Sequence, residues 1–349
     1  MNRLLESDLL DVLGRLTDWS PLRKARIFMT GGTGLFGLWM LSTLQAADMQ
    51  FGLDLEITVL SRDPGSFLKE NKFLSASPNI KFIQGDIKNF EYGDRHYDYL
   101  IHFATTPAKA TFEGEDQHRK FETLYFGTKH ILDFAVATGI QKILFTSSGV
   151  VYGPIDACAQ GVMESHLGGP DLRRPDSGLG EGKRIAEYLC AYYQEKYGVS
   201  YAIARCFSFI GPYLPLDLHY AIGNFIRNCI NQQDIVIKGD GKPVRSYLYM
   251  SDAITWLLMM LFSKEKKEIY NVGSSTAINI LSLAELVRET LAPNTKIILT
   301  QSDHEKLDNF KRNIYLPNTD SIKEKFEVDE WTSLKDGIQK TAAFYSKYL

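Results

Sequence analysis

The chain has few cysteines, and their spacing limits what they can do. Cys158, Cys190, Cys206 and Cys229 are separated by 32, 16 and 23 residues. This spacing matches neither a CxxC metal-binding pair nor a dense disulfide framework. We therefore expect reduced cysteines, a reducing compartment and no metal site.

Long apolar runs are also missing. No stretch reaches the roughly 18 uncharged apolar residues of a membrane-spanning helix. Near the N-terminus, Glu6, Asp8 and Asp11 interrupt the segment where a secretory signal needs an apolar core. The sequence therefore predicts a soluble, cytoplasmic protein.

A bulk charge of one sign is the third absence. The chain has 39 basic and 42 acidic residues, a net charge of −3, and offers no field for nucleic acid or an anionic membrane. Its 44% hydrophobic and 23% charged residues exclude a disordered, collagen-like or coiled-coil chain. At about 150 residues per domain, 349 residues predict two domains, or one domain with an appended lobe.

Between residues 26 and 206, short apolar runs alternate with helical patterns. We expect strands at 26–30, 56–60, 80–84, 97–104, 142–148 and 200–206, and helices at 35–47, up to 137, and at 182–197. Strands and helices that alternate in this way predict an α/β fold with a doubly wound parallel sheet covered on both faces.

The two ends of the chain depart from this alternation. Apolar residues between 9 and 16 predict a short N-terminal helix with Ser7 as its N-cap, packed on the body or on a second subunit. After Arg205 the pattern loosens, and a later helix shows Ser282 and Glu285 as a capping box. We expect an N-terminal extension at 1–25, a dinucleotide-binding domain at 26–205 plus 236–273, and a smaller, mixed substrate-binding lobe at 206–235 plus 274–349.

A glycine-rich turn follows the first strand and opens a helix. Gly31 and Gly34 let the backbone approach a pyrophosphate, while Gly37 lets the helix pack close to the strand. The free N–H groups of the helix N-terminus then face the anion. We interpret the turn as a Rossmann-like dinucleotide site made by Gly31, Thr33, Gly34, Leu35, Phe36 and Gly37. A tight turn without a ligand is the alternative.

The end of the second strand bears on the choice of cofactor. Ser61 stands where NAD enzymes usually carry an acidic residue, and Arg62 follows it. A neutral side chain beside a guanidinium suits a 2′-phosphate, which favours NADP slightly over NAD. In the alternative, Arg62 is a solvated surface residue and Asp63 reaches the ribose.

Eight motifs in order connect these elements. They are MTGGTGLFG (29–37), QGDI (84–87), IHFAT (101–105), TSSGVVYG (146–153), GEGKRIAE (180–187), ARCFSFIGP (204–212), GDGKPVRSYLYMSDA (239–253) and YNVGS (270–274). Over residues 26 to about 345 the chain resembles the extended short-chain dehydrogenase/reductase family of nucleotide-sugar epimerases, dehydratases and 4-ketoreductases.

The resemblance implies a role for several residues. Cofactor contacts fall on Asp86, Ile87, His102, Phe103, Ala104, Thr105 and Lys183, and substrate contacts fall on Ser147, Ser208, Arg245 and Arg312. Ser148 matches the serine that binds the sugar oxygen, and Lys183 matches the lysine that holds the nicotinamide ribose. Arg245 would grip the substrate diphosphate, because its fork matches phosphate oxygens. Ser208 stands where the family usually has Asn.

The family's catalytic tyrosine is missing. It belongs four residues before Lys183, where this chain has Leu179, and the neighbouring positions are Gly178 and Gly180. The Asp-Glu pair of related 4,6-dehydratases is likewise replaced by Gly149 and Val150. Elimination of water needs a base and an acid, so dehydration is disfavoured, and Val150 also weakens a decarboxylase interpretation.

The proton must therefore come from elsewhere. Glu164, His166 and Asp176 lie in the following loop, and Tyr152 is the nearest phenol, although for each a packing or solvated role remains open. Water is a further donor, because losing a positioned acid costs about 10²–10⁴-fold in rate and leaves some turnover.

Three hypotheses follow. The first is an NAD(P)-dependent 4-ketoreductase or 4-epimerase acting on a nucleotide-linked hexose or deoxyhexose for surface polysaccharide synthesis. The second is a catalytically impaired cofactor-binding protein that serves as a sensor or partner subunit, and the third is a 4,6-dehydratase. By resemblance, helices at 116–138 and 182–197 form the interface of a homodimer, although core burial explains the apolar stripe of Tyr188, Leu189, Tyr192 and Tyr193 as well.

Overall fold

The computed structural model describes residues 6–106, 113–155, 160–218, 220–300 and 314–346. The chain divides into two compact units. The first unit is residues 1–151, 170–205 and 254–270, and the second unit is residues 152–169, 206–253 and 271–349. Residues 152–169, 236–253 and 271–273, which the sequence places in the dinucleotide-binding domain, thus cluster with the second unit.

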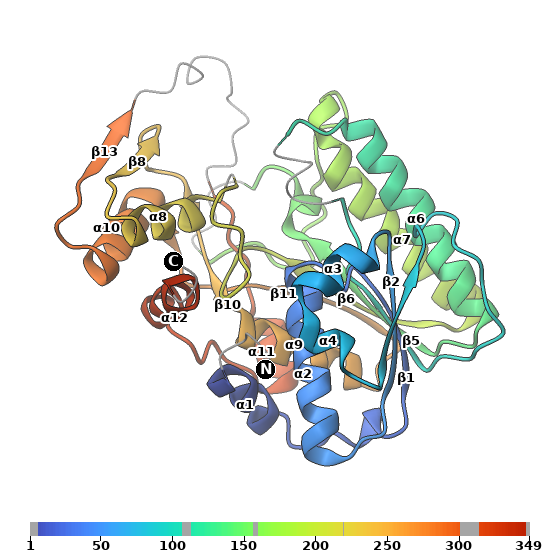
Figure 1. Ribbon diagram of the computed structural model, residues 1–349. Helices are drawn as coiled ribbons and strands as arrows, with labels where there is room; N and C mark the ends of the chain where they lie inside the picture. The colour runs from blue at the N-terminus through green and yellow to red at the C-terminus, as the bar shows by residue number, and fades with distance from the viewer. Residues whose placement is uncertain (1–5, 107–112, 156–159, 219, 301–313, 347–349) are drawn as a thin grey trace. The chain divides into compact units, whose positions relative to one another are not determined.

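A seven-stranded sheet forms the centre of the first unit (Figure 1). Its order is β11-β6-β5-β4-β1-β2-β3, and the pairs β1–β2, β2–β3, β1–β4 and β4–β5 are parallel. The strands are β1 (Arg26–Thr30), β2 (Glu56–Ser61), β3 (Ile80–Gln84), β4 (Tyr99–His102), β5 (Lys142–Ser148), β6 (Ser200–Cys206) and β11 (Lys267–Val272). The reversal of order at β1 and β4 is the doubly wound arrangement that the sequence predicts.

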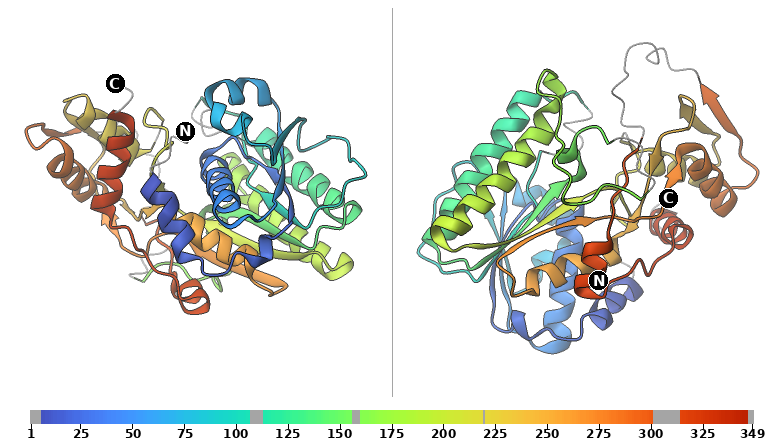
Figure 2. Two further views of the ribbon diagram at one scale, coloured as in Figure 1. Left: turned by 60° about the horizontal axis from the view of Figure 1, so that its bottom comes forward. Right: turned by 180° about the vertical axis from the view of Figure 1, so that it is seen from behind.

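Helices cover both faces of this sheet. Helices α6 (Gln117–Ala137) and α7 (Gly178–Tyr197) lie side by side on one face, and α2 (Leu35–Phe51) lies on the other (Figure 2). A core of Phe28, Leu100, Phe134, Phe145 and Ala186, among others, fills the layer under α6 and α7. Because both faces are covered, β1 and β5 are buried along almost their whole length, as in other parallel sheets.

The first unit also contains the N-terminal helix and two short helices. Helix α1 (Glu6–Arg15) packs beside α2. Of the two predicted alternatives, packing on the body or on a second subunit, the structure shows the first. Ser7 lies inside α1, so our prediction that it caps the helix was wrong. Helices α3 (Pro64–Glu70) and α4 (Lys72–Ser75) connect β2 to β3.

The second unit is built from short strands and helices. It contains β7 (Phe209–Ile210), β8 (Ile235–Lys238), β9 (Val244–Arg245), β10 (Leu248–Tyr249), β12 (Ile278–Asn279), β13 (Ile297–Thr300), α8 (Ala221–Ile230), α10 (Ile280–Leu291), α11 (Asp320–Phe326) and α12 (Leu334–Ser346). Helix α9 (Met250–Phe262) begins in the second unit and ends in the first. In the described part of the chain no helix is long and apolar enough to span a membrane.

Two helix starts differ from the prediction. Helix α10 is capped by Asn279, whose side chain accepts a hydrogen bond from the Ser282 amide at 2.8 Å, so Ser282 is not the cap. Helix α7 begins at Gly178 and not at Gly182. Glycines lower helix propensity, and tertiary packing overrides that penalty here.

Candidate functional site

The glycine turn after β1 is held by two close approaches of backbone. Gly31 has a φ of +71°, and a Cβ there would lie 2.5 Å from the Ala104 nitrogen. A Cβ at Gly37 would collide with the backbone of Gly31 and Gly32. Both positions therefore require glycine for the turn itself.

Gly34 differs from these two, because the turn does not need it. In the described chain, the nearest atom to a Cβ at Gly34 would be the Gly31 carbonyl oxygen, at an ordinary 3.6 Å. Gly34 is the N-cap of α2, and both it and Thr33 are exposed. An open, Cβ-free N-cap at the end of a 17-residue helix fits a pyrophosphate. Leu35 and Phe36 are half-buried, and the Phe36 ring lies 5.8 Å from that of Phe103.

At the end of β2, Ser61 is half-buried and Arg62 is exposed. The Asp63 carboxylate caps α3 by accepting a hydrogen bond from the Ser66 amide at 3.0 Å. The Asp63 carboxylate therefore already binds the N-terminus of α3, and this hydrogen bond competes with a contact to the ribose.

The end of β3 leads into a turn made by Asp86 and Ile87. The Asp86 carboxylate accepts a hydrogen bond from the Lys88 amide at 2.9 Å. The Ile87 side chain packs so closely on Gly127 of α6 that a Cβ there would lie 2.5 Å from it. Both residues are half-buried at the carboxyl edge of the sheet, where nucleotides bind in doubly wound folds.

His102 ends β4 and is buried. Its Nδ1 lies 2.6 Å from the Thr30 hydroxyl, its Nε2 lies 3.3 Å from the Thr128 hydroxyl, and its ring stacks on Phe145 at 5.3 Å. Burial, helped by the positive charge of Lys183, lowers the pKa of His102 to about 3. The histidine is therefore a neutral bridge between two hydroxyls. Phe103 is buried, Ala104 is half-buried and Thr105 is exposed.

The two serines that end β5 have different surroundings. The Ser147 hydroxyl is buried and donates to the Glu187 carboxylate of α7. The half-buried Ser148 hydroxyl accepts a hydrogen bond from the Val150 amide at 3.3 Å. Ser147 thus belongs to a buried network, and its predicted contact with substrate stays a prediction.

Lys183 and Leu179 share one face of α7, a turn apart. The buried Lys183 ammonium donates to the Thr146 carbonyl oxygen at 2.6 Å and lies 4.7 Å from the centre of the Phe145 ring. Leu179 is half-buried in the first turn of the helix. The Lys183 ammonium is thus bound to β5 two residues before Ser148, and an aliphatic side chain stands one helical turn before the lysine.

Glycines hold the start of α7 in place. A Cβ at Gly178 would collide with the Gln117 carbonyl oxygen of α6, and one at Gly180 would lie 2.5 Å from the Pro170 ring. A Cβ at Gly182 would lie 2.6 Å from the Leu124 side chain. The three glycines place Leu179 at a defined position, from which the helix cannot slip without a clash.

Three of the four other proton donors considered above already have hydrogen-bond partners. In the second unit, the Tyr152 hydroxyl donates to the side-chain oxygen of Asn271 at 2.7 Å, and the Glu164 carboxylate accepts from the backbone N–H of Asn271 at 2.8 Å. In the first unit, the exposed Asp176 forms a two-bonded pair with Arg174 at 2.7 and 3.0 Å. His166, in the second unit, is exposed. These contacts support packing roles for Tyr152 and Glu164.

Of the predicted substrate residues in the second unit, Arg245 lies in β9 and Ser208 directly precedes β7. Arg245 is half-buried, pairs with Ile278 across β9 and β12, and donates to the Val244 carbonyl oxygen at 2.8 Å. Burial raises the pKa of the neighbouring Tyr247 to about 12, against a smaller opposing effect of Arg245. Ser208 is half-buried. Arg312 lies outside the described residues.

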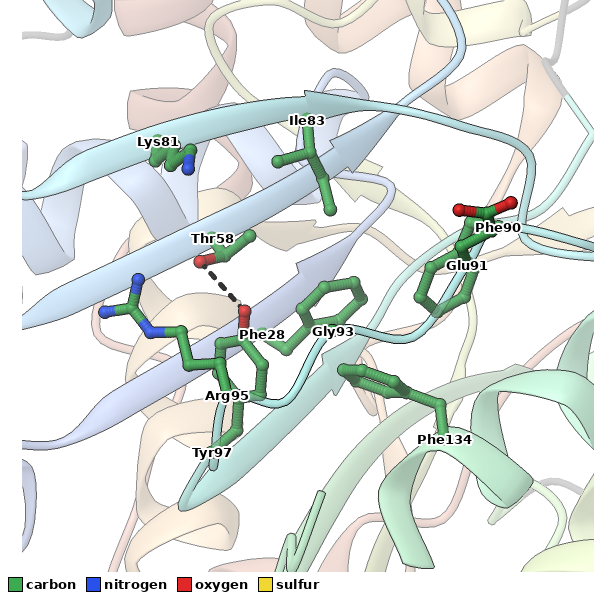
Figure 3. A pocket seen from close by; sticks show the side chains of 10 residues that line it. All are labelled: Phe28, Thr58, Lys81, Ile83, Phe90, Glu91, Gly93, Arg95, Tyr97 and Phe134. Atoms are coloured by element: carbon green, nitrogen blue, oxygen red, sulfur yellow. Dashed lines mark hydrogen bonds between the residues drawn. The ribbon is translucent and has the colours of Figure 1, made fainter. Parts of the chain in front are cut away.

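A crevice of about 220 Å³ in the first unit contains none of the predicted site residues (Figure 3). It lies over the sheet between β3 and the segment 90–97, with Lys81 and Arg95 at its edge and the Tyr97–Thr58 hydrogen bond of 3.3 Å at its floor. Phe28, Phe90 and Phe134 pack on one another in its wall. The crevice is therefore a gap between packed aromatic side chains of the core.

Sequence reasoning missed three residues that shape the site. Thr30 and Thr128 bridge through His102, and Glu187 binds Ser147. For Glu187 a signal was present, because it follows Lys183 by four residues, as Lys183 follows Leu179. Equal spacing of four residues puts all three on one face of a helix.

Comparisons with known proteins agree with this geometry. The family model described as NAD dependent epimerase/dehydratase family matches residues 27–273. UDP-glucuronic acid decarboxylase 1 of Arabidopsis thaliana is 27% identical over 327 residues, which is 94% of this chain and 71% of the plant protein.

Two solved structures show the same fold. UDP-N-acetylglucosamine 4-epimerase from Methanobrevibacter ruminantium M1 has a TM-score of 0.79 at 20% identity, over 94% of this chain and 100% of that one. A UDP-glucuronic acid 4-epimerase mutant from Bacillus cereus, in complex with NAD and a fluorinated substrate analogue, also has a TM-score of 0.79 at 20% identity, over 93% and 100% of the two chains. With the matched family model, the doubly wound sheet and the glycine turn, the chain belongs to the NAD-dependent epimerase/dehydratase family, within the extended short-chain dehydrogenase/reductases.

Proposed function

We propose that this chain reduces or epimerises C4 of a nucleotide-linked hexose with NAD(P). One observation carries the proposal: the Lys183 ammonium is bound at the Thr146 carbonyl oxygen, two residues before Ser148, while Leu179, Gly149 and Val150 offer no proton donor where the family resemblance implies one. When bound, the nicotinamide would supply or accept a hydride. Lys183 would bind its ribose, and Ser148 would donate a hydrogen bond to the sugar oxygen.

Between the two reactions, the missing phenol favours reduction. Oxidation of an alcohol requires a base that takes the hydroxyl proton, and Leu179 cannot do so. Reduction starts from a ketone, whose oxygen becomes an alkoxide that water protonates. Loss of a positioned acid slows such a step by about 10²–10⁴-fold, and a steady supply of reductant still drives it forward.

The same reasoning addresses the reactions of the relatives. A 4,6-dehydratase needs an acid and a base near C5 and C6, and positions 149 and 150 hold glycine and valine. A decarboxylase that relies on a carboxylate at position 150 meets the same vacancy. Dehydration therefore remains the weaker alternative, and UDP-glucuronic acid belongs among the substrates to be tested.

The end of β2 supports NADP. Arg62 is exposed and Asp63 is used as the cap of α3, so the nearest acidic group has a structural partner. An exposed guanidinium next to a neutral Ser61 suits a 2′-phosphate. Consumption of NADPH agrees with net reduction, because an epimerase returns its hydride.

A second candidate is a cofactor-binding protein without turnover, which would act as a sensor or as a partner subunit. Leu179 is the observation in its favour. Because Lys183 also binds ribose, its presence is compatible with either function.

The first experiment follows absorbance of reduced nicotinamide with purified protein, NADPH or NADH, and a panel of nucleotide-linked 4-keto-6-deoxy sugars, with products of NDP-glucose and UDP-glucuronic acid analysed separately. We expect slow oxidation of NADPH with one keto sugar. A flat trace with every keto sugar would overturn the reductase proposal.

Leu179→Tyr, with Leu179→Phe as its matched control, tests the missing proton donor. We expect Leu179→Tyr to raise turnover by about 10²-fold or more, since a phenol one turn before Lys183 restores a positioned acid, and Leu179→Phe to leave turnover at the wild-type level. Equal rates in the two variants, or loss of activity in both, would show that the site is remodelled around leucine.

We also propose a homodimer through α6 and α7. Tyr188 is 59% exposed, and Tyr192 and Phe126 are exposed as well, whereas Leu189 and Tyr193 are buried in the core of the unit. The apolar stripe of α7 therefore has a buried half and an exposed half. Exposed aromatic side chains on adjacent helices are typical of a subunit interface.

A further inference from the structure

Three residues on successive turns of helix α7 lie on the same face of the helix, and two of them bind β5. Leu179, Lys183 and Glu187 are spaced by four residues and share one face of the helix. Lys183 donates to the carbonyl oxygen of Thr146, and Glu187 accepts from the hydroxyl of the next residue, Ser147. Two successive turns of α7 are thus attached to two successive residues of β5.

The attachment through Glu187 is the stronger of the two. Arg205 of β6 donates to the Glu187 carboxylate from Nε at 3.1 Å and from Nη2 at 2.7 Å. The side chains of Arg205 and Glu187 are 13% and 9% exposed. A bidentate salt bridge of this kind has one favourable orientation. Because both side chains are nearly buried, moving either one away from the other is costly, since an unpaired charge would remain in the interior.

We propose that Glu187 is the positioning residue for Lys183. With Ser147 and Arg205 it fixes the rotation of α7 about its axis and its height along β5. The Lys183 ammonium, one turn away on the same face, is thereby held against the Thr146 carbonyl oxygen, next to Ser148. The inference rests on the proposed function in one respect, namely that Lys183 binds the cofactor.

Glu187→Gln is the decisive change because it keeps the shape of the side chain. The amide of glutamine has only one acceptor oxygen, and its NH₂ group would face the N–H donors of Arg205. The two-bonded pair is then lost, the guanidinium stays buried, and α7 is free to shift until Arg205 is resolvated.

The test measures how fast a small amine-acylating reagent modifies individual lysines, by peptide mass spectrometry in the cofactor-free protein. Lys120 of α6 and Lys142 of β5 serve as controls within the same molecule, because their side chains are 1% and 8% exposed and paired with Glu115 and Glu268. In Glu187→Gln we expect Lys183 to react about tenfold faster, with Lys120 and Lys142 changed by less than about twofold.

Two results would overturn the proposal: an unchanged rate at Lys183, or an equal increase at all three lysines, which would indicate general loosening. If Glu187→Gln does not fold, Ser147→Ala and Arg205→Lys take its place, since each weakens the network in part, and both should raise the rate at Lys183 alone.

Cofactor affinity gives a second, separate measurement. Glu187→Gln should weaken cofactor binding about tenfold in the wild-type background and have no further effect in a Lys183→Met background, because Glu187 acts through Lys183. Additive effects would contradict the positioning role. If the wild-type protein bound no dinucleotide, the proposed function would fail, while the acylation rates would still decide the role of Glu187.

Discussion

The buried His102 makes stability depend on pH in a defined window. An unfolded histidine binds a proton below about pH 6.5, whereas in the folded chain burial, and then the charge of Lys183, lower the pKa of His102 to about 3. Between these two values the unfolded state binds more protons than the folded state. The free energy of unfolding therefore falls as the pH falls from 6.5 toward 3.

The size of the effect follows from the same shift. The loss approaches about 1.4 kcal/mol per pH unit well below pH 6.5, and acidification from pH 6.5 to pH 5 costs about 1.7 kcal/mol from this one side chain. The contacts explain why the neutral form is held so firmly. The two ring nitrogens meet the Thr30 and Thr128 hydroxyls, the ring stacks on Phe145, and a proton would add a second positive charge near Lys183.

His102→Gln is the matched comparison, since its amide keeps a polar group but does not titrate. The variant will be less stable at every pH because the stacking on Phe145 is lost, so only the slopes are compared. Urea unfolding of both proteins at pH 6.5, 6.0, 5.5 and 5.0 should show a stability difference that changes by about 1.7 kcal/mol over this range, with a slope that approaches about 1.4 kcal/mol per pH unit at its acid end. Parallel curves would refute the assignment of a neutral, buried His102.

Three further predictions concern the turn, the core and the surface. Gly34→Ala should fold with near wild-type stability and lose cofactor affinity, because a Cβ at Gly34 would meet backbone only at an ordinary 3.6 Å. Gly37→Ala should lose stability as well, because a Cβ there would collide with the backbone of Gly31 and Gly32. Thermal unfolding and titration with NAD(H) and NADP(H) compare the two variants, and an equal loss of stability would contradict the geometry. Glu268→Ala should lower the free energy of unfolding by about 3 kcal/mol, since it leaves the buried Lys142 ammonium without the carboxylate that lies 2.9 Å away. Urea unfolding measures this change, and a loss below about 1 kcal/mol would contradict a stabilising buried ion pair. Tyr188→Glu should produce monomers in sedimentation experiments. Leu10→Glu on α1 is the control and should not, because Leu10 has a similar exposed fraction of 55% but lies outside the proposed interface. A monomeric wild-type protein would contradict the proposed interface.

Much of the fold follows from local patterns. The strands at 26–30, 80–84 and 142–148 have the predicted bounds, because apolar runs bounded by turn residues need no information from distant parts of the chain. The glycine turn could be predicted for the same reason, since strand, turn and helix are contiguous. Helix starts were less accurate, because Gly178, Gly180 and Gly182 look unsuitable for a helix until their contacts with α6 and with Pro170 are known.

The sequence by itself also determined what chemistry is missing. The absence of a phenol at position 179 and of carboxylates at 149 and 150 is a matter of residue identity, and no arrangement of the backbone changes it. Family resemblance located those positions, and the structure added that Leu179 and Lys183 share one face of α7.

Only the tertiary structure decided which polar side chains bind each other. Ser147 and Ser148 are adjacent and chemically alike, yet Ser147 binds Glu187, 40 residues away, and Ser148 binds the nearby Val150 amide. His102 meets Thr30 across 72 residues of chain, and its neutral state depends on that burial. The physical reason is that strand register and helix packing determine the partners of a buried polar group, and both depend on contacts between distant segments.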